Sequence, residues 1–113
     1  MTVSYSRVVG TVFFSQSMEE LASHLAEAGF AVTVGRWSLT LEDWQRVFKL
    51  RYVGNITPEA PFEVDGDCYE VATHQVVDYC ERLAAFFREH RIAYDFDHIV
   101  DGKEVVGEYK SAL

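Results

Sequence analysis

Cysteine and proline are scarce: the 113 residues include two of each, together with seven glycines. So few cysteines exclude a disulfide scaffold, and so few prolines and glycines exclude collagen-like and low-complexity chains. No apolar run approaches the roughly 20 residues of a membrane-spanning helix. The sequence also lacks a glycine-rich phosphate loop, a nucleophile elbow and a Cys-x-x-Cys pair. We therefore predict no cofactor and favour binding over catalysis.

Basic side chains are also few, because ten Lys and Arg stand against eighteen Asp and Glu, for a formal net charge of −8. Residues 1–60 carry a net charge of −1, whereas residues 61–113 carry −7. A field of this sign repels nucleic acid and anionic membranes and attracts basic proteins. The same charge would also keep a small domain soluble, so both interpretations stay open.

Aromatic side chains are abundant, with eight Phe, six Tyr and two Trp. With a hydrophobic fraction of 49%, the chain has the apolar surface that a disordered sequence lacks. We expect one domain, residues 1–113, because each half alone would be near the lower size limit for a self-sufficient core.

The first third of the chain predicts a strand, a helix and a strand. Residues 7–14 are rich in β-branched and aromatic side chains, as in a buried strand. Ser17 and Glu20 have the spacing of a helix capping box, and Gly29 stands where that helix would end. Residues 30–35 predict the second strand.

The middle of the chain contains one ambiguous segment. Strict alternation predicts a strand over residues 46–53. Residues 37–41 also alternate, so they can pair with this strand as a hairpin whose connection lies at Glu42 and Asp43. The other interpretation is a short helix over residues 41–45, and the sequence leaves this choice open.

The second half predicts a long helix and a terminal hairpin. Residues 54–61 contain both prolines and predict a loop, and Asp65-Gly66 predicts a turn. Asp67 is then a candidate N-cap for a helix that extends to about His90. Alternating residues 94–100 precede Asp101-Gly102, a type I′ turn signal, and residues 103–109 return as the last strand.

The predicted order is therefore βαββαβ with an additional C-terminal strand. Two helices on one face of an antiparallel sheet define an α+β, ferredoxin-like sandwich, in which the first and third strands lie centrally.

The two cysteines bear on the cellular compartment. On the predicted helix, Cys68 and Cys80 would lie roughly 18 Å apart along the axis, too far for a disulfide. Two thiols and the absence of a recognisable targeting signal lead us to expect a cytoplasmic protein.

Six acidic residues between positions 63 and 81 form the first candidate site. Carboxylates complement the dipole at a helix N-terminus, but six exceed what capping requires. We predict that they dock a basic partner. The residues are Glu63, Asp65, Asp67, Glu70, Asp78 and Glu81.

A second candidate site lies on the face of the predicted sheet that the two helices leave uncovered. Asp95 and Asp97 point to one side of their strand, about 7 Å apart. Lys49 and Arg51 share the corresponding side of the third strand, with Thr11 between them on the first. These residues suit a polar ligand, although an open sheet face lacks walls that exclude water.

The histidines predict neither a metal site nor a general base. His74 and Asp78 are neighbours on the predicted helix, but two ligands do not make a metal site. His98 falls on the apolar side of its strand, where a core histidine with one hydrogen bond is expected.

Two function classes follow from these patterns. The first is a small inhibitory protein of the immunity or antitoxin kind, which neutralises a basic partner such as a nuclease toxin without binding nucleic acid or membrane itself. The second is a small-molecule-binding protein, or a dimeric enzyme, that uses the open sheet face. A homodimer is compatible with either class.

Overall fold

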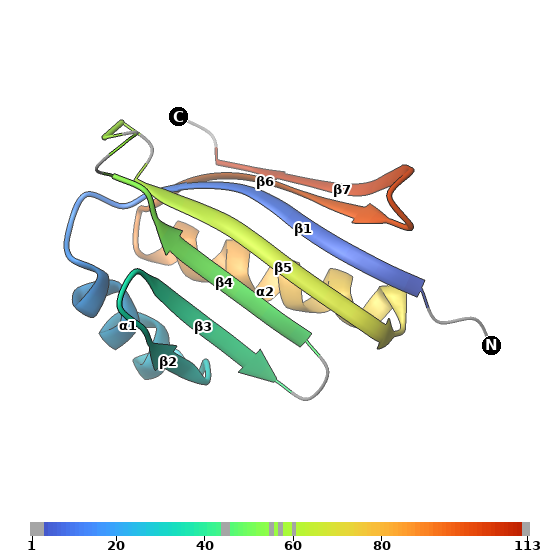
Figure 1. The fold of residues 1–113 in the computed structure, drawn as a ribbon, viewed down its shortest axis with the longest axis horizontal. Coiled ribbons are helices and arrows are strands. Elements are labelled where there is room, and N and C mark those ends of the chain that lie inside the picture. The colour runs from blue at the N-terminus through green and yellow to red at the C-terminus, as the bar shows by residue number, and fades with distance from the viewer. Residues whose placement is uncertain (1–3, 44–45, 55, 57, 60, 112–113) are drawn as a thin grey trace.

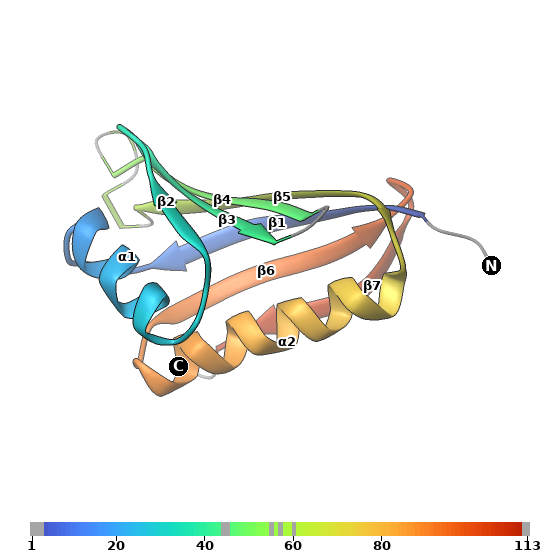
Figure 2. The same ribbon diagram turned by 90° about the horizontal axis from the view of Figure 1, so that it is seen from below.

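A computed structural model describes residues 4–43, 46–54, 56, 58, 59 and 61–111. In chain order the elements are β1 (Ser4–Phe13), α1 (Met18–Glu27), β2 (Val32–Val34), β3 (Ser38–Asp43), β4 (Arg46–Tyr52), β5 (Phe62–Val71), α2 (Thr73–Glu89), β6 (Ala93–Val100) and β7 (Glu104–Lys110). All seven strands belong to one antiparallel sheet, and both helices lie on the same side of it (Figures 1 and 2). The fold is therefore α+β.

The strand order is β2-β3-β4-β5-β1-β6-β7, with β5 at the centre (Figure 1). The number and order of the strands differ from the ferredoxin-like βαββαβ layout. In particular, β5 lies between β1 and β4, which were expected to lie side by side at the centre.

Residues 62–71 are the main correction to the sequence-based expectation. They form the central strand, so the predicted turn at Asp65-Gly66 and the helix N-cap at Asp67 are both wrong. The helix begins at Thr73 instead, after the N-cap residue Ala72. Gly66 is buried because the ring of Phe48 packs over it: a Cβ atom there would lie 2.7 Å from Cδ1 of that ring. An Asp-Gly pair in the sequence can thus mark either a turn or a strand in which an aromatic ring covers the glycine.

This correction also changes the argument about the cysteines. Cys68 lies on β5 and Cys80 on α2, so the two do not share a helix and the 18 Å estimate fails. Both are fully buried thiols in the core.

The ambiguous middle segment is a hairpin. β3 pairs with β4 from Ser38↔Arg51 to Asp43↔Arg46. The expected connection at Glu42 and Asp43 is therefore part of β3, and the predicted short helix is wrong for residues 41–43. Residues 44 and 45 lie outside the described part of the chain.

Several local expectations are confirmed. The Ser17 hydroxyl accepts a hydrogen bond from the Glu20 N–H at 3.2 Å, which is half of the predicted capping box. Asp101 and Gly102 have φ values of 52° and 68°, as a type I′ turn requires at both central positions.

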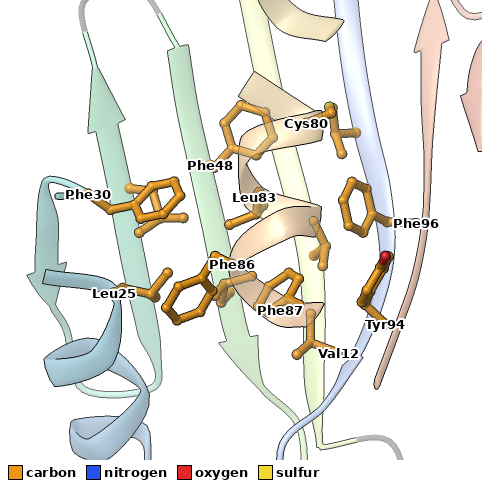
Figure 3. Close-up of a cluster of buried hydrophobic side chains, with 14 of the residues drawn as sticks. Val12, Leu25, Phe30, Phe48, Cys80, Leu83, Phe86, Phe87, Tyr94 and Phe96 are labelled. Atoms are coloured by element: carbon orange, nitrogen blue, oxygen red, sulfur yellow. The ribbon is translucent and has the colours of Figure 1, made fainter. Parts of the chain in front are cut away.

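The core fills the space between the sheet and the two helices (Figure 3). Alternate residues of β1, β4, β5 and β6 point into it and are buried, as the period of a strand requires. Leu25 of α1 and Leu83 and Phe87 of α2 meet them from the other side. The intervening residues of the strands point away from both helices and form a second, uncovered surface.

Candidate functional site

We call this second surface the open face: it is the side of the sheet opposite the helices (Figure 2). Strand register places its side chains in rows that cross the sheet. From β4 to β7, one row is Lys49, Asp65, Val9, Asp97 and Glu108, and the next is Arg51, Glu63, Thr11, Asp95 and Lys110. The open face thus combines carboxylates from β5, β6 and β7 with cations from β4 and β7.

Asp65 lies near the middle of the open face and is held by two arginines. Its Oδ2 lies 3.0 Å from Arg51, and its Oδ1 lies 3.9 Å from Arg7. The side chain is only 17% exposed, and Oδ1 is buried without a hydrogen bond. Because two cations neutralise Asp65, it is a structural centre of the face rather than an available charge.

Two tyrosines meet at the end of β5 near α2. The Tyr5 hydroxyl donates to Oδ1 of Asp67 at 2.7 Å, and this hydrogen bond is the main reason why the pKa of Tyr5 rises to about 12. The Tyr5 ring lies 4.9 Å from the ring of Tyr69, which is 61% exposed. The two rings therefore add an aromatic surface to the open face, beyond Asp67 on β5.

The carboxylates of β6 have different surroundings. Asp95 pairs with Lys110 of β7 at 3.6 Å. Asp97 has Val9 on one side and Glu108 on the other, and it makes no hydrogen bond or ion pair with another described residue. A like-charged pair directly opposite across two strands is unfavourable. Asp97 and Glu108 are therefore the carboxylates of this face that would gain most from an incoming cation.

A shallow hollow of about 470 Å³ lies between these groups, over β1. Its polar lining comes from Arg7, Thr11, Glu63, Asp65, Asp95 and Asp97. The alternative ligand residues Asp95, Asp97 and Thr11 are thus brought together. Lys49 and Arg51 lie on the same face but beyond β5, outside the hollow.

The six acidic residues of the first candidate site do not form one surface. Glu63, Asp65 and Asp67 alternate along β5 on the open face, whereas Asp78 and Glu81 are exposed on α2, in the layer behind the sheet. The Glu70 side chain lies outside the described residues. The two groups separate because residues 62–71 form a strand and not the start of the helix.

Sequence reasoning also left out part of the open face. Tyr5, Arg7 and Glu108 were not singled out. Strand pairing places Arg7 opposite Asp67 and Glu108 opposite Asp97, whereas Tyr5 reaches Asp67 through its hydroxyl. Exposed aromatic side chains are also candidates for a docking surface: Tyr69 on β5 and Trp37, in the connection between β2 and β3, are each 61% exposed. Trp44 lies outside the described residues.

His98 is a buried titratable group on the helix side of β6. It is fully buried, with Nε2 2.9 Å from the Ser6 hydroxyl and Nδ1 without a hydrogen bond. Desolvation lowers the pKa of its imidazole below the ordinary 6.5. This is the expected core histidine.

The lowered pKa predicts an acid-sensitive fold. Below about pH 6.5 His98 takes up a proton in the unfolded chain, whereas burial disfavours its protonation in the folded chain. His98 therefore does not reduce the free energy of unfolding above that pH, but it does so increasingly as the pH falls below it. We expect urea denaturation between about pH 7.5 and pH 5 to show this loss, at up to about 1.4 kcal/mol per pH unit. His98→Leu should flatten the curve, whereas His74→Leu on the exposed side of α2 should leave it unchanged. An equal slope in wild type and His98→Leu would contradict the assignment.

Among the described residues, no three His, Cys, Asp or Glu side chains are arranged to hold a metal ion. Within the same residues, neither helix combines the length and apolar character needed to cross a bilayer. Comparison of the chain with family models, curated proteins and solved structures found no match.

Proposed function

We propose that this chain is a small acidic binding protein that neutralises a basic protein, in the manner of an immunity protein or antitoxin, and that it docks through the open face. The observation that carries the proposal is the uncovered sheet face itself. It gathers Glu63, Asp95, Asp97 and Glu108 at the surface, and the exposed ring of Tyr69 lies on the same face farther along β5.

Charge and shape both favour a protein partner. The hollow is a shallow depression in a broad face, which matches the relief of protein interfaces better than that of enclosed ligand sites. Carboxylates attract Lys and Arg over a distance and raise association rates, while a desolvated aromatic such as Tyr69 supplies affinity. Nucleases and other nucleic-acid-binding proteins carry clustered Lys and Arg, so a nuclease toxin is the partner we favour. The proposal includes a cytoplasmic location, which fits the two buried thiols.

The revised docking surface differs from the six-residue patch expected from the sequence. Glu63, Asp65 and Asp67 remain part of it, and Asp95, Asp97 and Glu108 join them from β6 and β7. Asp78 and Glu81 drop out because they lie on α2.

The alternative is a polar small molecule bound in the hollow by Asp95, Asp97 and Thr11. One observation favours it: these groups line a single space of about 470 Å³. That space is open to solvent, and water screens charges in an unwalled site. Its shape therefore suits a protein partner better than a small molecule.

Mapping a basic probe onto the protein tests the proposal. We expect an oligoarginine peptide to shift amide NMR signals of β1, β5 and β6, and to bind more weakly as salt rises, because screening shortens electrostatic attraction to about 8 Å at physiological ionic strength. Shifts centred on α2, at Asp78 and Glu81, would instead support the original patch. Guanidinium ion alone serves as the small probe. If it saturates the same signals as tightly as the peptide does, the small-ligand alternative is correct.

Three matched double variants separate position from net charge. Glu63→Lys with Asp97→Lys should weaken peptide binding by about tenfold or more, because both carboxylates lie on the open face. Asp78→Lys with Glu81→Lys on α2 and Glu19→Lys with Glu27→Lys on α1 change the net charge equally. Each should have a much smaller effect. Equal losses in all three would mean that only overall charge matters, and the docking surface would be rejected.

A further inference from the structure

The two edges of the sheet are unequal. β2 has three residues, whereas β7 has seven and presents a long edge (Figure 1). Val105 and Val106 on β7 are 51% and 40% exposed, and a hollow of about 500 Å³ runs along Val105, Val106, Gly107 and Glu108. A long edge strand presents unpaired N–H and C=O groups that can accept another strand.

The direction of the β7 backbone groups follows from one hydrogen bond. Ser111 N–H donates to the Tyr94 carbonyl of β6 at 2.9 Å. Because alternate residues of a strand direct their N–H and C=O groups to opposite sides, those of Tyr109 also point toward β6. The N–H and C=O groups of Glu108 and Lys110 therefore point outward from the edge.

The side chains of the same two residues determine what can pair there. On the open face, Lys110 has its anion, Asp95, at 3.6 Å, whereas Glu108 stands opposite Asp97 without a cation. An added strand should therefore bring a cation opposite Glu108 and an anion opposite Lys110, two residues apart.

We propose that this strand is β7 of a second copy of the chain, paired antiparallel about a two-fold axis at Tyr109. Glu108 then faces Lys110 of the second copy, and Lys110 faces Glu108 of the second copy. The same register joins the outward N–H and C=O groups of these residues in four main-chain hydrogen bonds. Each row of the open face continues into the other copy as Asp97, Glu108, Lys110 and Asp95.

Backbone direction and side-chain charge together select this register. The outward groups of Glu108 and Lys110 can pair only if the two-fold axis passes through a residue and not between two residues, and an axis at Glu108 or at Lys110 would place two like charges opposite each other. The self-complementary pairing is isologous, so it closes as a dimer and leaves the two β2 edges at its ends.

Sedimentation of charge variants tests the dimer. We expect wild type to dimerise reversibly as its concentration rises toward about 1 mM. Glu108→Lys places two lysines on each edge and Lys110→Glu places two glutamates, so each variant alone should dimerise at least about tenfold more weakly. An equimolar mixture of the two variants should form a heterodimer, because each lysine then meets a glutamate.

Variants near the start of β7 supply the control. Glu104→Lys and Lys103→Glu change the charge equally but lie outside the pairing of Glu108 with Lys110, so they should dimerise as wild type does. A wild type that stays monomeric up to about 1 mM overturns the proposal. It is equally overturned if the single variants dimerise as wild type does, or if the mixture stays monomeric.

Discussion

Replacing Gly10 with alanine is expected to lower the free energy of unfolding by about 3 kcal/mol or more. Gly10 lies in β1 directly opposite Phe96 of β6. A Cβ atom added there would collide with the Asp95 carbonyl oxygen and the Phe96 Cα. These are backbone atoms, so no rotamer change relieves the overlap and the two strands must separate. Urea denaturation of Gly10→Ala and wild type measures the loss.

Gly107→Ala on β7 is the matched control. A Cβ atom there meets the edge of the Tyr109 ring at 2.9 to 3.2 Å, and this half-buried side chain of an edge strand can shift more easily than the backbone of a central strand. We expect a change of less than about 1 kcal/mol, because alanine also recovers some strand propensity. If both variants lose the same stability, the close approach of β1 and β6 is not what requires glycine at position 10.

Separation of β1 and β6 would also alter the candidate site. Asp95 and Asp97 lie on β6, and Thr11 follows Gly10 on β1, so the hollow depends on the spacing of these two strands. Folded Gly10→Ala protein should therefore bind oligoarginine more weakly, while Gly107→Ala should not.

Elements with local signals could be predicted from the sequence. The Ser17 cap, the alternation of β4 and the Asp101-Gly102 turn each depend on residues close together in the chain. Asp95 and Asp97 could be placed on one face for the same reason, because a strand has a period of two.

β5 could not be predicted in this way. Its acidic residues resemble a helix N-terminus, and Asp65-Gly66 resembles a turn. What decides the structure is long-range: β5 pairs with β1 on one side and β4 on the other, and the Phe48 ring fills the space beside Gly66. The prediction that six acidic residues form one patch was wrong for the same reason, because it required the helix to start at Asp67.

Phe48 and Gly66 should accordingly be strongly coupled. Phe48 is fully buried on β4, packs 4.7 Å from the Tyr79 ring of α2 and covers Gly66. We expect Phe48→Ala to cost about 3 to 5 kcal/mol, through lost burial and the cavity that remains. Gly66→Ala alone should cost about 1 to 3 kcal/mol, because the buried ring has little room to move away from the new methyl group.

The double variant distinguishes this packing from a general intolerance of substitution. Once Phe48→Ala has removed the ring, Gly66→Ala fills vacated space and gains strand propensity, so its further cost should fall to about zero. The resulting coupling, about 1 kcal/mol or more, is measured by a double-mutant cycle in urea. Gly10→Ala in the Phe48→Ala background is the control, and it should stay as costly as in wild type because its obstacle is the backbone of β6. Additive losses for Phe48→Ala and Gly66→Ala would show that the Phe48 ring is not the reason why position 66 requires glycine. The physical account of β5 would then have to be replaced.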